Sequence, residues 1–394
     1  MSPIVPVVPA PSVAIPWDQN ESPHLWRCPL RDNRSNMSLR VLIAEDSDLF
    51  VEILVEILDE ESGLEIVAIA DNGADAVEYC EAHRPDIVLM DIHMPRLDGL
   101  SATEEIMARC PTPILVITSD PHRGGVDLSF RALSAGALDL MAKPATHPFP
   151  EDQKERLLRK IRLLSQIPVV RHVRARSRQR FGTPDAASRH TDTASKNGPV
   201  AIVGIVGSTG GPRALANICT ELPEDFPAAI LIVQHITHGF SRHLAGWLDK
   251  HSALQVYEGE DGLALRPGHA VIAPTRHHMV VDDELRLVID DSPPIGGHRP
   301  SGDRLLMSLA RHASPRAIGL VLSGMGNDGA AGLTALAQSG CPTLAQNEAT
   351  SVVYGMPRAA RARGIVELSL PDTEIADALI SLVAELPSKA TGRR

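Results

Sequence analysis

The chain has 394 residues, 43% of them hydrophobic and only 3% aromatic, with a formal net charge of −11. This length predicts two or three domains, and the negative charge argues against a general nucleic-acid-binding protein. Its five cysteines form no C-x-x-C pair, which indicates free thiols in a reducing compartment and no zinc site. There is neither an apolar run long enough to span a membrane nor a signal-peptide pattern, so we expect a cytoplasmic protein without direct membrane insertion.

The first part of the chain alternates between apolar segments and amphipathic helical patterns. Residues 1–37 are rich in proline and are expected to form a disordered extension. Strands are predicted at residues 39–44, 64–70, 85–90, 113–117 and 138–142, with helices between them and a last helix over 151–167. This alternation predicts an α/β domain over 38–165, with a doubly wound parallel sheet in a flavodoxin-like strand order.

Acidic residues follow the first and third of these strands. Glu45 and Asp46 come directly after one strand and Asp91 after the other. Three carboxylates that meet at one edge of a sheet need a cation to offset their repulsion, and oxygen ligands of this kind suit Mg²⁺. Thr118 and Lys143, which follow the next two strands, are candidate ligands for phosphate oxygens.

Residues 39–144 resemble the response-regulator receiver family. The resemblance is carried by four segments: Glu45-Asp46, Asp91-Ile92-His93-Met94-Pro95 with Asp98-Gly99, Thr118-Ser119, and Lys143-Pro144. It implies that Asp91 accepts phosphate from a histidine kinase, that Mg²⁺ is bound by Glu45, Asp46 and Asp91, and that Thr118 and Lys143 form the phosphate switch. Two positions differ from the family pattern, because Glu45 replaces the commoner Asp and Leu140 stands where many receivers have an aromatic residue.

A basic segment separates this domain from the rest of the chain. Five arginines lie within residues 171–180, and small or polar residues dominate from there to Pro199. This composition predicts a flexible linker over 166–198. A solvated linker is the simplest interpretation, and an electrostatic tether to an acidic partner is the alternative.

The second domain begins with an apolar segment that turns sharply into a helix. Residues 200–207 are predicted to form a buried strand, Ser208 lies at the turn, and a helical pattern follows from Pro212. Ser208 could cap the helix, belong to a nucleotide-binding loop, or be a nucleophile. The glycine spacing matches neither of the phosphate-binding fingerprints, and G-x-S-x-G is not strictly present because Val206 occupies the first glycine position.

Further strands are predicted after this turn, and two of them end at residues of interest. The strand over 228–234 ends at His235, and the strand over 317–322 leads to Asp328. A serine needs a base that removes its proton, and a carboxylate holds a histidine base in one tautomer. His238 competes with His235 for the role of base, and we favour His235 because it directly follows its strand. Shorter strands are expected at 269–274, 279–282 and 285–289, a last core strand at 341–346, and a closing helix at 372–386.

Residues 199–386 resemble the catalytic domain of the CheB family of chemotaxis methylesterases. Five segments carry this resemblance: 207–211, 232–235 with Gly239-Phe240, 298–301, 323–329 and 351–357. It implies a second doubly wound, mostly parallel α/β domain over 199–388, followed by a tail at 389–394. It assigns Ser208 as nucleophile, His235 as base, Asp328 as the residue that orients the base, and the backbone N–H of Met325 as an oxyanion donor. The departures from the pattern, at 274–279 and at Gly302, are not expected to touch this triad.

Together the two resemblances imply phosphorylation-activated hydrolysis of glutamate γ-methyl esters and deamidation of glutamines. The implied partners are methyl-accepting chemoreceptors and a CheA-type histidine kinase, and the esterase chemistry needs no cofactor. A non-catalytic regulator that binds receptors after phosphorylation is the main alternative. A transcription factor is disfavoured because the only basic run lies in the linker.

Overall fold

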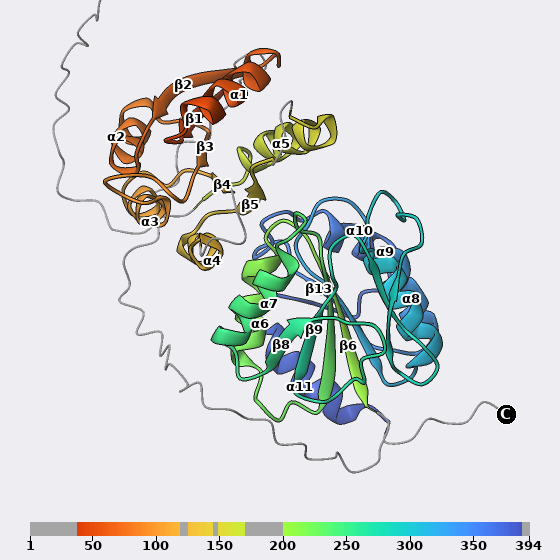
Figure 1. Cartoon of the computed structure of the whole chain (residues 1–394). Helices are drawn as coiled ribbons and strands as arrows, with labels where there is room; N and C mark the ends of the chain where they lie inside the picture. The colour runs from red at the N-terminus through yellow and green to blue at the C-terminus, as the bar shows by residue number, and fades with distance from the viewer. Residues whose placement is uncertain (1–37, 119–124, 145–148, 170–199, 388–394) are drawn as a thin grey trace, which may run out of the picture. The chain divides into compact units, whose positions relative to one another are not determined.

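The computed structural model describes residues 38–118, 125–144, 149–169 and 200–387 (Figure 1). The expectations for the N-terminal extension, for Ser119, for the tail at 389–394 and for the linker from residue 170 onward therefore lie outside the described residues. Two large sheets, with their helices, account for most of the structure.

The first sheet has five parallel strands in the order β2-β1-β3-β4-β5. This is the expected flavodoxin-like order, and it makes β1 and β3 direct neighbours. The strands are β1 (Leu39–Ala44), β2 (Leu64–Ala70), β3 (Ile87–Met90), β4 (Ile114–Thr118) and β5 (Asp139–Ala142). The helices are α1 (Asp48–Asp59), α2 (Gly73–His83), α3 (Gly99–Arg109), α4 (Gly125–Ala135) and α5 (Glu151–Leu164).

The helices of this part follow the apolar periodicity of the sequence. In α1 the buried residues are Phe50, Leu54, Ile57 and Leu58, which lie on one helical face. The side chain of Asn72 caps α2 by accepting hydrogen bonds from the amides of Ala74 and Asp75. The expected helix over 151–167 is shorter, because α5 ends at Leu164.

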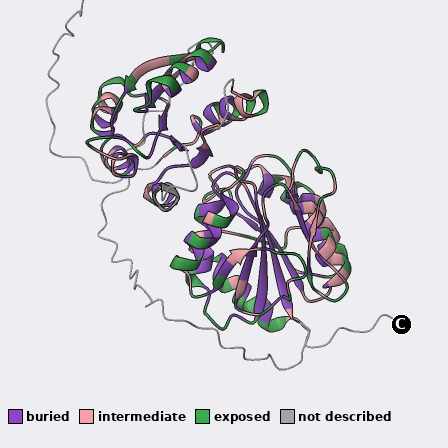
Figure 2. Ribbon diagram, in the orientation of Figure 1, coloured by how far each residue is buried: buried purple, intermediate pink, exposed green. Residues whose placement is uncertain are grey.

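The second sheet has seven parallel strands in the order β14-β13-β12-β6-β7-β9-β8. Every residue of the central strands β6 (Ala201–Gly207) and β7 (Ala228–Gln234) is buried, as Figure 2 shows. Burial on both faces explains why these strands read as continuous apolar runs. The remaining strands are β8 (Gln255–Glu258), β9 (His269–Ile272), β12 (Ala317–Val321), β13 (Thr343–Gln346) and β14 (Leu368–Leu370).

Helices cover both faces of this second sheet (Figure 1). One layer contains α6 (Gly211–Glu221), α7 (Ser241–His251) and α11 (Ile375–Glu385), and the other contains α8 (Gly302–His312), α9 (Ala330–Gln338) and α10 (Met356–Ala362). A separate antiparallel hairpin of β10 (His278–Val281) and β11 (Leu287–Asp290) packs against α8. The predicted doubly wound, mostly parallel architecture is therefore confirmed for both sheets.

Two edge strands differ from the sequence prediction. The predicted last core strand at 341–346 corresponds to β13, which is fully buried, but the edge strand β14 pairs alongside it and was not predicted. At the opposite edge β8 pairs with β9 and was not predicted. Both strands are short and partly exposed, so neither has the long apolar run on which the prediction relied.

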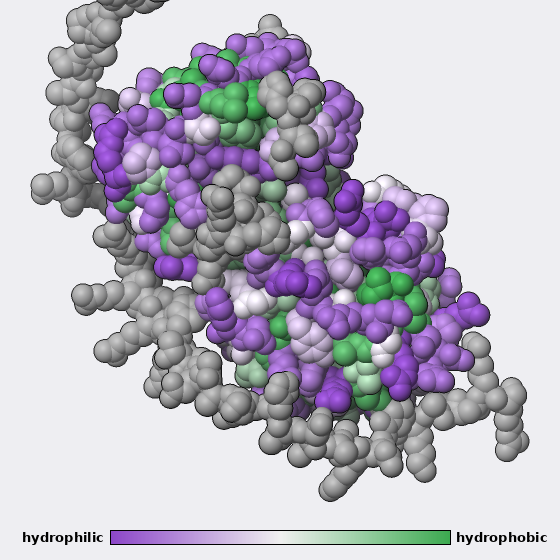
Figure 3. Space-filling model, in the orientation of Figure 1, coloured by the Kyte–Doolittle hydropathy of each residue, from purple (hydrophilic) through white to green (hydrophobic). Residues whose placement is uncertain are grey.

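None of the helices described is both long enough and apolar enough to cross a membrane. Figure 3 shows hydrophobic residues as separate patches among hydrophilic ones on the face in view. Among the residues whose burial is described, the exposed large hydrophobic side chains are single residues well separated in sequence: Leu49, Ile69, Ile295, Met307, Leu368 and Ile380. Scattered residues of this kind are normal on a protein surface.

Two neighbouring residues of α8 provide a test of how the second core is packed. Leu306 is fully buried, whereas Met307 is 45% exposed. Leu306→Ala should lower the free energy of unfolding by about 2–5 kcal/mol, because it removes buried methyl groups and leaves a cavity. Met307→Ala, the matched control, should change it by less than about 0.5 kcal/mol. Urea unfolding of the full chain checks both values, and equal effects of the two variants would contradict the assigned burial.

Candidate functional site

Three carboxylates meet at the carboxyl edge of the first sheet. Glu45 follows β1 and Asp91 follows β3, and the pairing of these strands brings the two residues together. With Asp46 they form a group whose possible ligand oxygens all lie within 4.8 Å of one another. Glu45 and Asp91 are buried, and Asp46 is exposed. Oxygen ligands with an open side toward solvent fit Mg²⁺, which keeps several waters when it binds to proteins.

Lys143 lies between two of these acids. Its Nζ is 2.6 Å from Glu45 Oε2 and 3.1 Å from Asp91 Oδ2. Burial and the neighbouring charge of Asp91 raise the pKa of Glu45 to about 7, although Lys143 partly opposes this shift. The hydroxyl of Thr118 is buried and has no hydrogen-bond partner among the described residues. A free hydroxyl and an ammonium beside Asp91 are suitable groups for binding phosphate oxygens.

In the second sheet the register of three strands brings another set of residues to one edge. Gly207 pairs with Gln234, so that Ser208 and His235 are the next residues on β6 and β7. On the other side, the amide of Ser208 donates to the carbonyl of Ser323 at 3.0 Å. A Cβ on Gly324 would lie 2.6 Å from Ser208 Cβ, so the close approach of these backbones requires glycine there.

His235 is bound to Asp328 through one of its ring nitrogens. His235 Nε2 lies 2.8 Å from Asp328 Oδ2. The other ring nitrogen, Nδ1, is buried and has no hydrogen-bond partner among the described residues. A histidine in this state, with one nitrogen held by a carboxylate and the other available, can accept a proton from a hydroxyl.

The carboxylate of Asp328 is held by the start of α8. The amides of Gly302 and Asp303 donate to it at 2.6 and 3.0 Å, and the hydroxyl of Ser301 donates to Oδ1 at 2.9 Å. Burial by itself would raise the pKa of Asp328, but the bonds from His235 and from the α8 amides outweigh burial and lower it well below its usual range. Asp328 is therefore ionised at neutral pH.

The expectation that Gly302 does not touch the triad residues is wrong. Its amide makes one of the hydrogen bonds to Asp328, and its missing side chain also matters. A Cβ at Gly302 would lie 2.6 Å from Cγ2 and 2.9 Å from Cβ of Val206 on β6. Only glycine lets the first turn of α8 come this close to the strand, because Val206 is branched at Cβ and has little rotamer freedom.

His238, the competing base, is engaged elsewhere. Its Nδ1 lies 3.0 Å from the hydroxyl of Thr275, and no contact with Asp328 is found within the described part of the chain. The geometry thus brings together Asp328 and His235, the histidine favoured from sequence. The amide of Met325 has no hydrogen-bond acceptor among the described residues, so this N–H is available to a ligand.

Comparison with known proteins agrees with these features. The family model described as CheB methylesterase matches residues 203–379, and that of the response regulator receiver domain matches residues 41–149. A protein-glutamate methylesterase/protein-glutamine glutaminase of Anaeromyxobacter dehalogenans is 44% identical over 87% of this chain and 97% of its own length. The chain belongs to the CheB methylesterase family.

Another relative in this CheB family is the protein of the same name from Nitrosospira multiformis, 38% identical over 88% of this chain and 98% of its own length. Among solved structures, the Thermotoga maritima CheB methylesterase catalytic domain is 38% identical and has a TM-score of 0.46. The match covers 47% of this chain and 99% of that one.

Several residues of this CheB-family site received no role from sequence. Gln234 Nε2 donates to the carbonyl of Ser208 at 2.7 Å and so stabilises the turn between β6 and α6. Ser301 both caps α8 and binds Asp328. Both residues lie in segments that carried the resemblance, namely Ile232–His235 and His298–Ser301. The contact of Ser301 depends on where α8 begins relative to Asp328, which a motif does not report.

The close approach of Gly302 and Val206 gives a testable coupling. Gly302→Val should lower the free energy of unfolding by about 1–3 kcal/mol, because the new side chain overlaps Val206. Val206→Gly opens this space, so the double variant should be more stable than the sum of the single effects, by about 1 kcal/mol or more.

The control is Gly246→Ala in α7, where an added Cβ meets nothing within 4 Å. That change should be neutral or stabilising by up to about 1 kcal/mol. Denaturant unfolding of the wild type, the two single variants and the double variant measures the coupling, and the Gly246→Ala protein is unfolded in the same way as the control. Strictly additive effects of the two substitutions would contradict the proposed overlap.

Proposed function

We propose that this chain is a phosphorylation-activated protein-glutamate methylesterase and protein-glutamine glutaminase, with Ser208, His235 and Asp328 as its catalytic triad. The observation that carries this proposal is the 2.8 Å contact between His235 and the ionised Asp328, which leaves His235 Nδ1 buried and without a hydrogen-bond partner among the described residues. The hydroxyl of Ser208, at the end of the adjacent strand, is the proposed partner of that nitrogen.

The reaction follows from these roles. Ser208 Oγ attacks the ester carbonyl of a glutamate γ-methyl ester while His235 Nδ1 takes the hydroxyl proton. The tetrahedral intermediate collapses, and His235 gives the proton to the departing methanol. Water, activated by the same histidine, then attacks the acyl-enzyme, which releases a glutamate carboxylate and restores Ser208. In deamidation, ammonia leaves in place of methanol.

The oxyanion of the intermediate needs hydrogen-bond donors. We assign this role to the backbone N–H of Met325, which has no other acceptor among the described residues. It follows Gly324, which packs directly against Ser208. Removal of a single donor of this kind typically costs 10²–10³-fold in turnover, so the arrangement of 323–329 is part of the proposed machinery.

The residues proposed to regulate the esterase activity lie at the edge of the first sheet. Asp91 accepts a phosphoryl group from a CheA-type histidine kinase, and Glu45, Asp46 and Asp91 would hold the Mg²⁺ that neutralises charge in this transfer. Lys143 and Thr118 then bind the phosphoryl oxygens. We propose that the unphosphorylated receiver restricts access to Ser208. A shift from 1% to 99% accessible enzyme needs about 5.5 kcal/mol, so basal activity is expected to persist.

The proposed domain boundaries follow the sequence assignment: a receiver over 38–165, a linker over 166–198 and a catalytic domain over 199–388. The proposed substrates are glutamate side chains on the cytoplasmic helical bundles of methyl-accepting chemoreceptors, which places the proposed site of action in the cytoplasm.

Removal of the proposed nucleophile tests the chemistry. Ser208→Ala should reduce methanol release from methylated receptor membranes by about 10³-fold or more, because no acyl-enzyme can form. Ser381→Ala, a change at a hydroxyl on α11 that bonds within its own helix, is the matched control and should retain activity. If wild-type protein releases no methanol, or if Ser208→Ala remains active, the proposal fails in favour of a receptor-binding regulator or of another nucleophile.

Removal of the proposed phosphate acceptor tests the proposed regulation by phosphorylation. With Asp91→Asn, a small-molecule phosphodonor and Mg²⁺ should no longer stimulate methanol release, whereas basal release should stay within about twofold of wild type. Asp86→Asn, which alters a carboxylate before β3 rather than after it, is the control and should keep its stimulation. Undiminished stimulation of Asp91→Asn would refute the proposed switch.

A further inference from the structure

The amide of Gln234 links the main chains of the two residues proposed as nucleophile and base. Gln234 is the last residue of β7 and is only 2% exposed. Its Nε2 donates hydrogen bonds to the carbonyl of Ser208 at 2.7 Å and to the carbonyl of His235 at 3.2 Å. A carbonyl oxygen can only accept, so the nitrogen of the amide must face both of them. One NH₂ group thus bridges Ser208 and His235.

This bridge begins where the pairing of β6 and β7 ends. The last residues in register are Gly207 and Gln234, and the amide of His235 donates to the carbonyl of Gly207 at 2.9 Å. The carbonyl of Ser208 also accepts the amide of Gly211 at 2.8 Å, which closes the turn into α6. Beyond the last bond between the strands, the Gln234 side chain continues the link between the two segments.

The oxygen of the same amide fills space that two glycines leave open. A Cβ at Gly207 would lie 2.7 Å from Gln234 Oε1, and a Cβ at Gly211 would lie 2.2 Å from it. Side-chain carbons do not approach an oxygen this closely, so both positions require glycine while the amide stays in place. Two glycines of the segment 207–211 therefore make room for Gln234.

The amide also has a cost that an apolar side chain would not have. Gln234 Oε1 is buried and has no hydrogen-bond partner among the described residues. A buried acceptor without a partner destabilises the folded state. A methionine side chain is of similar length and would fill this space without that loss. The two donors of Nε2 are therefore what distinguishes Gln234 from a residue that only packs.

We propose that Gln234 is a positioning residue whose Nε2 fixes the main chain of Ser208 relative to that of His235. The Ser208 hydroxyl and His235 Nδ1 belong to residues just beyond the paired strands, so their separation depends on what holds these two segments together. A small misplacement of a reacting group can cost as much as 10²-fold in rate. This inference rests on the proposed triad.

Gln234→Met in the full chain removes both donors and keeps a side chain of similar length. In the methanol-release assay with receptor membranes, kcat should fall by about 10- to 100-fold while KM stays within about threefold of wild type, because the buried amide acts on the reacting groups and not on receptor binding. Each factor of ten corresponds to about 1.4 kcal/mol in the barrier. If Gln234 only packed, the folded variant would keep the wild-type kcat.

Gly211→Ala tests the same amide from the opposite side. The new Cβ would meet the end of a flexible side chain, so the fold can persist if the Gln234 amide moves away from its two carbonyls. We expect kcat to fall by about 10-fold or more, with KM within about threefold. The matched control is Gly246→Ala, where an added Cβ meets nothing within 4 Å. This control should keep the wild-type kcat and KM.

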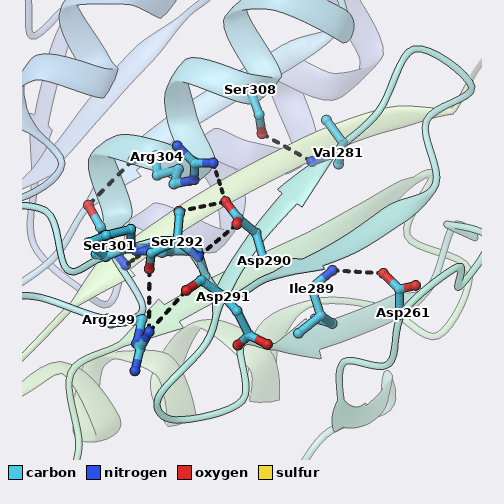
Figure 4. A network of polar contacts seen from close by, with 12 residues as sticks. Asp261, Val281, Ile289, Asp290, Asp291, Ser292, Arg299, Ser301, Arg304 and Ser308 are labelled. Carbon is cyan, nitrogen blue, oxygen red and sulfur yellow. Dashed lines mark hydrogen bonds and ion pairs between the residues drawn. The ribbon is translucent and has the colours of Figure 1, made fainter.

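A second control removes a comparable bond elsewhere in the same domain. Figure 4 shows the hydroxyl of Ser308 on α8 facing the amide of Val281 on β10, from which it accepts a hydrogen bond at 3.1 Å. The same hydroxyl donates to the carbonyl of Leu305 at 2.7 Å, so this side chain also links the main chains of two elements. None of these residues belongs to the proposed machinery, and Ser308→Ala should leave kcat and KM unchanged.

Carbonyl ¹³C resonances test the bridge without turnover. Ser208-Thr209 is the only Ser-Thr pair in the sequence, and His235-Ile236 is the only His-Ile pair. Two samples, each with ¹³C-carbonyl label in the first residue type and ¹⁵N label in the second, therefore select these two carbonyls. A carbonyl that loses a hydrogen bond moves upfield. Both resonances should move upfield in Gln234→Met and Gly211→Ala and stay in place in Gly246→Ala and Ser308→Ala.

The outcomes are distinct. A wild-type kcat in folded Gln234→Met, a change in KM alone, or carbonyl resonances that do not move in Gln234→Met would each overturn the positioning role. If wild-type protein shows no turnover that depends on Ser208, the proposed function fails, and the resonances alone decide whether Gln234 bridges Ser208 and His235.

Discussion

The ionised carboxylate of Asp328 joins a loop after β12, the N-terminus of α8 and the ring of His235. It accepts hydrogen bonds from two α8 amides, from the Ser301 hydroxyl and from His235. A buried charge is tolerated only when its hydrogen-bonding capacity is filled. The position of α8, the glycine at 302 and the orientation of His235 all follow from filling it.

Two carboxylates that follow parallel strands show how the surroundings decide ionisation. Asp328 and Glu45 are both buried, but helix amides and a histidine face Asp328, while Glu45 lies beside the like charge of Asp91. The pKa of the first is lowered and that of the second raised, although each follows a parallel strand. Strand ends thus gather carboxylates, and the groups packed against them determine their charge.

The sequence was sufficient to predict both parallel sheets, because buried strands and amphipathic helices leave strong apolar patterns. It also placed Glu45 beside Asp91 and favoured His235 over His238, since each follows a strand directly. It did not reveal that Gly302 contacts Asp328 or that Gln234 bridges two carbonyls. Those contacts depend on the crossing of α8 and on the path of a buried side chain, neither of which has a periodic signal.

The seven-stranded sheet ends in two very short strands. β14 has three residues and β8 has four. A long exposed edge strand offers a row of unpaired N–H and C=O groups to which a strand of another molecule can add. Here each edge presents only a few such groups in sequence, too few for a stable foreign strand. The shortness that hid β14 from a pattern-based prediction therefore also protects the folded sheet from aggregation by strand addition.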